Sequence, residues 1–448
     1  MQRGWPYYQM KKKKHLLVAL VALLMSLLLC GCEFGSNVED LYTLPKMPEE
    51  YTGLNQLLDE LREQGYEYAA PTSGQYLQSV HMVDLDGDRT VEAVAFFRKD
   101  NDEKPMKIFV YRAVDGSYEL LSRVESSGSS VDSVRYEDLN GDEICELIVG
   151  WKMAADVQTL AVYNIRREAL PLMSGSYSRY TIEDIDSDGL PELFVLRGDS
   201  STPTMEIYAW QTNILAVAYQ CVLSSNMTEL SRGSIVNGTT MEGRNAVFVT
   251  GVTEQNTAVT DVLVWQSDFL GGGSVVNAAL NATTGRSGLV QPYRRLRPDD
   301  INNDGITEIP APDSFSAQSD TLVNWRQCST TGYTYMISET YHSQSNGWYF
   351  VLPEIWWDRV TASEVETMAG ENQVLLSVDG YPVMAIYTLT GENRESRANI
   401  GERFLVRRQT GVVYAAELLE GADLYGMDQS LLRNNFNMTV NEWLPSGS

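Results

Sequence analysis

The chain has 448 residues, and its composition of 43% hydrophobic and 21% charged residues is that of a folded protein with a sizeable core. The formal net charge of −26 excludes nucleic acid as an expected partner, because phosphate backbones are bound by surfaces rich in lysine and arginine. Cys145, Cys221 and Cys328 are widely spaced and form no CxxC pair, which argues against a disulfide framework and a zinc site.

The first 31 residues combine a basic segment with an apolar one. Lysines occupy 11–14, and the apolar run 16–29 that follows is short for a membrane span and typical of a signal-peptide core. The run ends in Leu29-Cys30-Gly31-Cys32, which resembles the lipobox of bacterial lipoproteins. The resemblance implies that residues 1–31 are a signal peptide and that Cys32 carries the lipid. We then expect a membrane partner, with the chain lipid-anchored on the outer face of the cell membrane of a Gram-positive bacterium; the alternative is an uncleaved signal anchor.

Residues 32–75 are expected to form a tether that contains one short helix. The segment 33–52 is polar and irregular. In the segment 53–65 four leucines recur at i, i+3, i+4 and i+7, and Gly65 stands where the pattern stops, so we predict an amphipathic helix. The four leucines are Leu54, Leu57, Leu58 and Leu61.

An acidic segment then occurs four times, and we call its occurrences copies 1 to 4. Each has Asp at position 1, Leu or Ile at 2, Asp or Asn at 3, Asp at 5, Glu at 9 and an apolar residue at 10. The interval between copies 3 and 4 is about twice the other two, which predicts a missing copy near 237–250. There the chain keeps the apolar segment AVFVTG but has lost the acids. The copies read DLDGDRTVEAV from Asp84, DLNGDEICELI from Asp138, DIDSDGLPELF from Asp184 and DINNDGITEIP from Asp300.

The spacing of the acids predicts a cation site in each copy. Oxygen atoms at positions 1, 3 and 5 of a tight loop can converge on one hard cation, as in the first half of an EF-hand. The residues after position 9 are β-branched and aromatic, so the loop should join two strands instead of two helices. The alternative is an acidic turn whose Asp, Asn and Gly serve hairpin geometry alone.

The pattern D-x-[DN]-x-D-x-x-x-[DE] followed by an apolar strand resembles the FG-GAP and VCBS repeats of calcium-binding β-propellers, including those of the integrin α-subunit type. In that family the loop joins two strands of one blade, and calcium stiffens the turn. The resemblance implies Ca²⁺ as a structural cofactor, with more than one ion bound. The implied ligands are Asp84, Asp86, Asp88 and Glu92; Asp138, Asn140, Asp142 and Glu146; Asp184, Asp186, Asp188 and Glu192; and Asp300, Asn302, Asp304 and Glu308.

Two features depart from the family pattern. Position 6 is usually glycine, but copies 1 and 2 have Arg89 and Glu143 there and carry a glycine at position 4 instead. Position 9 is Glu in all four copies, where Asp is more usual, so the closing carboxylate has a longer reach.

Residues 76–345 contain one strand-like segment after another, with turn signals between them and a repeat period of roughly 50 residues. The sequence therefore predicts a mainly β fold, a β-propeller of about five or more four-stranded blades with integrin-α-like repeats. A β-helix or an open array of repeats is the alternative.

Residues 346–448 differ in sequence pattern from residues 76–345. The segment GWYFVLPEIWW from Gly347 resembles the opening strand and turn of small domains that end many lipoproteins of Gram-positive bacteria. Its aromatic residues favour a core over a carbohydrate platform. Long strands follow, and DQSLLRNNF from Asp428 predicts a short helix. We expect an antiparallel α+β region, which is either a separate domain or the blades that close the propeller.

These features together favour a non-catalytic binding, adhesion or scaffold module whose ligand is a protein or a glycan at the cell surface. The alternative is an extracytoplasmic polysaccharide-active enzyme, a lyase or glycosidase, on the same scaffold. Beyond residue 31 the only histidines are His81 and His342, so histidine-based catalysis is poorly supplied, whereas carboxylate pairs remain open. An enzyme should show a deep pocket with convergent carboxylates, and a binding module a shallow face of aromatic and polar groups.

Overall fold

The computed structural model describes residues 51–155, 157–166, 171–197, 203–269, 271–292, 296–312 and 321–439. Over these residues the fold is mainly β, as the sequence predicts. The predicted signal peptide, the lipobox and Cys32 lie outside the described residues. Within them, no helix is long and apolar enough to span a membrane.

Helix α2 (Thr52–Glu63) is the amphipathic helix expected over 53–65. Three of its leucines, Leu54, Leu58 and Leu61, are buried, and their i, i+4, i+7 spacing places them on one face. Gly65 follows with a φ of 87°, a conformation that a glycine adopts without strain, and the helix ends before it.

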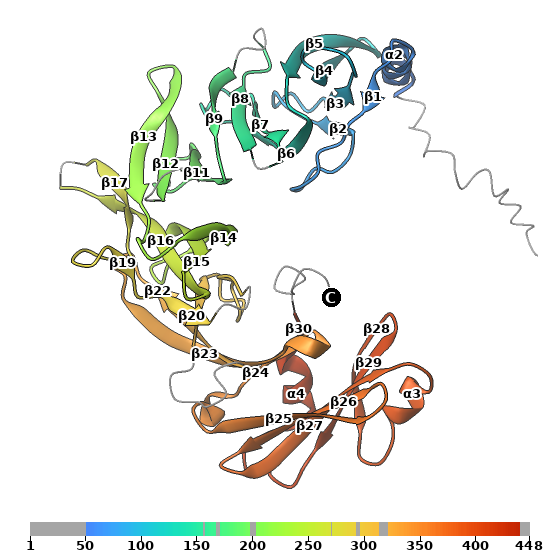
Figure 1. Cartoon of the computed structure of the whole chain (residues 1–448), viewed down its shortest axis with the longest axis vertical. Coiled ribbons are helices and arrows are strands. Elements are labelled where there is room, and N and C mark those ends of the chain that lie inside the picture. Colours follow the sequence, from blue (N-terminus) through green and yellow to red (C-terminus); the bar gives the residue numbers. More distant parts are fainter. Residues whose placement is uncertain are drawn as a thin grey trace, which may run out of the picture. The chain divides into compact units, whose positions relative to one another are not determined.

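Five antiparallel sheets follow along the described chain, and we number them I to V in chain order (Figure 1). Each is a meander in which consecutive strands pair, the arrangement found in propeller blades. Sheet I has a divided first strand, because β1 and β2 pair with different parts of β3. The strands of sheet I are β1 (Glu67–Tyr68), β2 (Val80–Val83), β3 (Glu92–Arg98), β4 (Met106–Val114) and β5 (Ser117–Ser126); those of sheet II are β6 (Ser130–Glu137), β7 (Glu146–Ala154), β8 (Val157–Tyr163) and β9 (Pro171–Ser176); those of sheet III are β10 (Arg179–Glu183), β11 (Glu192–Arg197), β12 (Thr204–Gln211) and β13 (Ile214–Val222).

Sheets IV and V carry additions to the same plan. In sheet IV, β20 pairs with β16 on the edge opposite to β15, and the short pair β18–β19 lies between β17 and β20 in the chain. In sheet V, the last described strand, β30, pairs with β24. The strands are β14 (Glu229–Thr239), β15 (Asn245–Val252), β16 (Thr257–Ser267), β17 (Gly273–Asn277), β18 (Leu280–Asn281), β19 (Arg286–Ser287) and β20 (Val290–Pro292), then β21 (Glu308–Pro312), β22 (Leu322–Cys328), β23 (Thr334–Ser343), β24 (Trp348–Val351) and β30 (Phe436–Met438).

The second strand of each of sheets I to IV is buried on both faces. In β11, Leu193 packs in a cluster shared with sheet II, whereas its neighbour Phe194 packs in a cluster shared with sheet IV. Side chains of a strand alternate between its two faces, so successive sheets stack face to face with a hydrophobic core between them. This packing explains why the residues after copies 1 to 3 read as one continuous apolar run.

The segment that was predicted to be a degenerate copy forms the second strand of sheet IV. β15 contains AVFVTG and is buried like β3, β7 and β11, so the prediction of a repeat unit here is confirmed. The turn before β15 spans only 240–244, whereas the corresponding loop of sheet I spans 84–91. The acids are missing because the turn is shorter.

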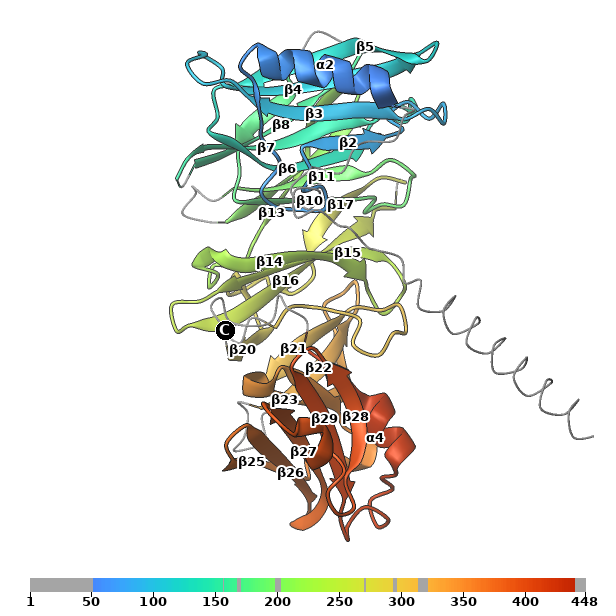
Figure 2. The same ribbon diagram turned by 90° about the vertical axis from the view of Figure 1, so that its right-hand side faces the viewer.

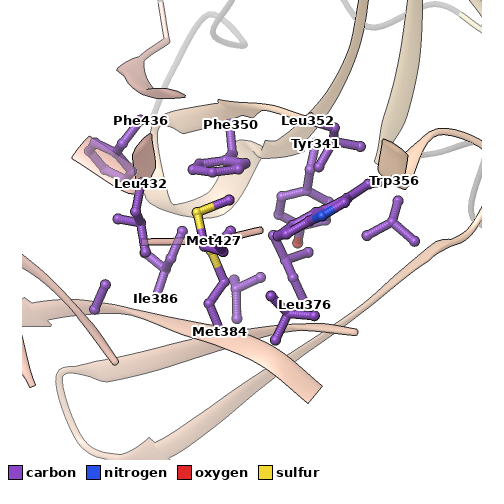
Figure 3. Close-up of a cluster of buried hydrophobic side chains, with 14 of the residues drawn as sticks. Tyr341, Phe350, Leu352, Trp356, Leu376, Met384, Ile386, Met427, Leu432 and Phe436 are labelled. Carbon is purple, nitrogen blue, oxygen red and sulfur yellow. The ribbon is translucent and has the colours of Figure 1, made fainter. Parts of the chain in front are cut away.

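Sheet VI follows and packs on sheet V through the cluster in Figure 3. There Phe350, after the start of β24, faces Met384 and Ile386 of β27. Trp348, Phe350 and Trp356 are fully buried, so the aromatic residues after Gly347 contribute to a core, as predicted. The elements of this region are η3 (Gln344–Asn346), η4 (Glu354–Trp356), β25 (Val360–Met368), β26 (Glu371–Val378), β27 (Tyr381–Thr390), α3 (Arg394–Arg397), β28 (Phe404–Gln409), β29 (Val412–Leu418) and α4 (Gln429–Asn435).

The helix predicted from Asp428 is α4, which lies beside β28 in Figure 2. The Oδ1 atom of Asp428 accepts the Leu431 N–H at 2.8 Å and so caps the helix. Sheet V crosses residue 346, where we expected a boundary, since β24 pairs with β23 and β30 returns to β24. The C-terminal segment is therefore joined to sheet V by hydrogen bonds as well as by the shared core.

Candidate functional site

The four acidic copies occupy the same place in their sheets. In copies 1 to 3 the loop joins the first strand to the second, and in copy 4 it lies between the bridge residue Asp299 and β21. The position 9 glutamate is in each case the first residue of the strand after the loop, and it is buried. The sequence expectation that these loops join strands is confirmed.

All four loops share one hydrogen-bond scheme. The N–H of position 2 donates to the position 9 glutamate, at 2.7 Å between Leu85 N and Glu92 Oε2 and at 2.9–3.1 Å in the other copies. The N–H of position 6 donates to the position 1 aspartate, and the N–H of position 7 donates to the position 5 aspartate. The carboxylates therefore hold the loop in shape by accepting hydrogen bonds from its own backbone, without an ion.

Positions 4 and 6 of every loop have a positive φ. At position 6 φ is 71° for Arg89 and 65° for Glu143, against 94° and 85° for the glycines of copies 3 and 4. At position 4 the glycines belong to copies 1 and 2, and Ser187 and Asn303 stand there in the others. Each copy thus has one glycine for two left-handed positions, and the departure from the family pattern leaves the loop shape unchanged.

The neighbouring loop explains which copies have glycine at position 4. A Cβ on Gly87 would lie 3.3 Å from the carbonyl oxygen of Glu143 in copy 2, and a Cβ on Gly141 would lie 2.9 Å from Leu190 in copy 3. Sheet IV, which follows copy 3, has only the short turn 240–244 in place of an acidic loop. Copy 3 carries Ser187 at position 4. Successive loops therefore lie against one another at one end of sheets I to III.

Copies 1 and 3 bring three carboxylates together. Oxygen atoms of Asp84, Asp86 and Glu92 lie within 4.8 Å of one another, as do those of the equivalent residues in copy 3. Within the described part of the chain, Asp84 Oδ1 and Asp86 Oδ1 are buried and accept no hydrogen bond. The other Asp86 oxygen lies 3.7 Å from the guanidinium of Arg166. Such a set of oxygen donors fits a hard cation. The copy 3 residues are Asp184, Asp186 and Glu192.

In copies 2 and 4, side-chain amide N–H groups donate hydrogen bonds to the equivalent carboxylate oxygens. In copy 2, Glu146 Oε1 accepts from the Nδ2 of Asn140 at 3.0 Å and from that of Asn164 at 3.1 Å. In copy 4, Gln327 Nε2 donates to Glu308 Oε1 at 2.8 Å and to Asp304 Oδ2 at 2.9 Å. These N–H groups satisfy the carboxylates without an ion. Sequence analysis missed Asn164, which directly follows β8, and Gln327 of β22, because both lie outside the repeated pattern.

The position 5 aspartates of copies 1 and 3 lie at the exposed side of the loop. Asp88 and Asp188 are exposed and lie outside the two carboxylate clusters found in the described residues. Their Oδ1 atoms accept the N–H of position 7 at 2.6 Å and 2.8 Å. The structure therefore gathers positions 1, 3 and 9, and it uses position 5 to shape the turn.

Burial makes the closing glutamates reluctant to ionise. It raises the pKa of Glu146, Glu192 and Glu308 to about 7, and it raises the pKa of Glu92 above its ordinary value. In all four copies the aspartates of the loop raise the pKa of the position 9 glutamate further, by like-charge repulsion. A cation held by the carboxylate clusters of copies 1 and 3 would favour the ionised glutamate there.

A second feature is a polar pocket of about 510 Å³ lined by the first strands of sheets II, III and IV. Its charged lining residues are Asp132, Arg135 and Glu137 of β6 and Arg179 of β10. Hydroxyl and amide groups supply most of the remaining wall. They belong to Ser73, Ser133, Gln158, Tyr177, Ser178, Tyr180, Thr181 and Asn237.

Hydrogen bonds fix the wall of this pocket. The Tyr177 hydroxyl donates to Asp132 Oδ2 at 3.2 Å, and the hydroxyls of Ser133 and Tyr180 are 3.1 Å apart. Burial raises the pKa of Glu137 above its ordinary value, although the charge of Arg135 opposes the rise. The pocket thus has two carboxylates and two arginines, so its lining favours neither an anion nor a cation.

Comparisons with known proteins assign no family. No protein-family model and no curated protein matches the chain. Among solved structures, an exotype rhamnogalacturonan lyase has 13% identity and a TM-score of 0.29 over 79% of this chain and 72% of that one. A rhamnogalacturonan lyase of Bacillus licheniformis has 12% identity and a TM-score of 0.29 over 79% and 72%. A GH43 β-1,3-galactosidase has 10% identity and a TM-score of 0.25 over 80% and 82%.

Proposed function

We propose that this chain is a lipid-anchored, non-catalytic surface module, a binding or scaffold protein whose repeats are stabilised by Ca²⁺ in copies 1 and 3. The observation that carries the calcium proposal is the pair of carboxylate clusters. Three carboxylates in one partly buried place repel one another, and a divalent cation with oxygen ligands removes that repulsion. In copies 2 and 4 the amide donors do this instead. The proposal therefore gives two structural ions and not four.

We also propose that sheets I to V are blades of one β-propeller. What supports this is the common meander order, the face-to-face cores between successive sheets and the loops gathered at one end of sheets I to III. The surface ligand would then be bound by the loops and inner strands of the blades.

Thermal unfolding of the full chain, with Ca²⁺ and with a chelator, tests the calcium proposal. At a free calcium concentration of about 100 Kd, each site adds about 2.7 kcal/mol, so we expect a rise in Tm of about 5 °C or more. A double variant, Asp86→Asn with Asp186→Asn, should lose most of this rise. The control Glu103→Gln removes an exposed acid outside the copies and should keep it. A Tm that does not respond to calcium in the wild-type chain would contradict the proposal.

The anchor is tested separately at Cys32. In a bacterial host, the wild-type chain should fractionate with membranes and take up labelled palmitate. Cys32→Ser should do neither, because the thiol that would be lipidated is gone. A variant that remains in the membrane fraction would favour the uncleaved signal anchor.

A further inference from the structure

The polar pocket between sheets II, III and IV is lined by side chains whose chemistry suits one class of ligand. We propose that it binds a neutral oligosaccharide. This inference names the ligand of the surface module proposed above and rests on that function, but it uses none of the acidic copies.

The charge of the pocket argues for a neutral ligand. Two carboxylates, Asp132 and Glu137, and two guanidinium groups, Arg135 and Arg179, line the pocket, so its charges balance although the chain carries a net charge of −26. An anionic ligand would meet the two carboxylates and the overall negative field, and a cationic ligand would meet the two arginines. A ligand without net charge avoids both costs.

The remaining wall suits a ligand rich in hydroxyl groups. Serine, threonine and tyrosine hydroxyls both donate and accept hydrogen bonds, and the amides of Gln158 and Asn237 offer one group of each kind. Sugar hydroxyls need partners of both kinds at short intervals. A volume of about 510 Å³ is within the range of small-molecule sites and large enough for more than one sugar ring.

The wall is held in place by contacts across three sheets. Asn237 of β14 donates to the Ile182 carbonyl at 2.7 Å and accepts from the Thr181 hydroxyl at 2.7 Å, which ties sheet IV to sheet III. On the other side, the N–H of Ser73 donates to the Asp132 carbonyl at 2.8 Å. Such support fixes the polar groups before a ligand arrives, which lowers the entropic cost of binding.

A glycine inside a strand makes room for one wall residue. Gly150 of β7 pairs with Ser133, and a Cβ at Gly150 would lie 2.2 Å from the Tyr177 hydroxyl. A glycine in a strand interior is otherwise unfavourable and often marks a close approach. Here it allows the Tyr177 hydroxyl to cross the strand and reach Asp132.

Isothermal titration of the full chain with tetraoses of different charge tests the proposal. The neutral probes are cellotetraose, maltotetraose and tetra-N-acetylchitotetraose, and the charged probes are tetragalacturonate and tetraglucosamine. We expect at least one neutral tetraose to bind, and both charged ones to bind at least tenfold more weakly. Arg135→Ala and Tyr180→Phe should each weaken binding at least threefold, because each removes a donor from the wall. Arg123→Ala, an exposed arginine on sheet I, should leave it unchanged.

The outcomes separate this inference from the calcium proposal. Titrations are repeated with Ca²⁺ and with chelator at a temperature where the chelated chain is folded, and neutral-tetraose binding should persist in both. Binding without any calcium response would support the pocket and contradict the calcium sites. No binding of a neutral tetraose at millimolar concentration, or binding that survives Arg135→Ala and Tyr180→Phe, would overturn the oligosaccharide site. Tighter binding of a charged tetraose would overturn it as well.

Discussion

At the scale of single residues, an amide nitrogen in place of a carboxylate oxygen at position 3 separates copies 2 and 4 from copies 1 and 3, whose carboxylates are suited to calcium. Position 3 is an aspartate in copies 1 and 3 and an asparagine in copies 2 and 4. The Asn140 amide donates to Glu146, whereas the equivalent oxygen of Asp86 accepts no hydrogen bond within the described residues. The difference is visible in the sequence, but its meaning is not, because it depends on Asn164 and Gln327, which lie outside the repeated pattern.

Asn140→Asp should make copy 2 depend on a cation. The substitution removes one N–H donor from Glu146 and adds a negative charge beside it, so in chelator we expect a loss of about 1–3 kcal/mol in the free energy of unfolding. Calcium should recover part of that loss. Urea unfolding with and without calcium measures both effects, and an equal loss in the two conditions would count against the assignment.

Gly305→Ala should destabilise the chain through backbone strain alone. Gly305 has a φ of 85° and nothing within 4 Å of a Cβ placed there, so the expected cost of about 1–2 kcal/mol comes from the left-handed conformation. Gly288 also has open space but no positive φ, and Gly288→Ala should be neutral or stabilising by up to about 1 kcal/mol. Equal effects of the two substitutions in urea unfolding would contradict the strain argument.

His81 should make the fold sensitive to mild acid. It is buried, with Nδ1 2.6 Å from the Tyr136 hydroxyl and Nε2 2.8 Å from the Gln78 carbonyl, and burial lowers its pKa. Its contribution to stability is therefore complete above the unfolded pKa of about 6.5 and is lost as the pH falls, because the unfolded state binds the proton more readily. Between pH 7 and pH 5, wild type should lose more stability to unfolding than His81→Gln, as measured by urea unfolding at each pH. Parallel pH profiles would contradict this.

At the scale of elements, the strand after each acidic copy is the best-predicted part of the fold. A continuous apolar run after an acidic turn indicated a buried strand, and β3, β7 and β11 are such strands; β15 has the same run after a turn without the acidic pattern. The short first strands of sheet I were harder to foresee, since β1 contains only Glu67 and Tyr68 and depends on pairing with β3. The return of β30 to β24 joins residues far apart in the chain, and no local pattern in the sequence signals it.

Trp356→Ala should disrupt the core between sheets V and VI. The indole is fully buried, and its Nε1 donates to the Tyr425 carbonyl at 2.9 Å, so we expect a loss of about 3–5 kcal/mol. Its neighbour Trp357 is only partly buried, and Trp357→Ala should cost less. Calorimetry that ranks the two substitutions the other way would contradict the assignment of Trp356 to the core.

At the scale of the whole molecule, the sequence predicted a repeated β fold and the place of a copy without acids. It did so because each repeat buries the same apolar strand, and that requirement remains where the acids are lost. Which copies could hold an ion could not be predicted in the same way. All four copies fit one ligand pattern, and the residue at position 3 together with the partners of the position 9 glutamates distinguishes them.

The measurement that tests the central claim most directly is the number of calcium ions bound by the folded full chain, counted by native mass spectrometry after exchange into dilute calcium. The account predicts two ions for wild type, one for Asp86→Asn and one for Asp186→Asn. A count of zero would show that copies 1 and 3 are acidic turns without a cation. A count of four would show that the amides of Asn140, Asn164 and Gln327 do not replace the ion.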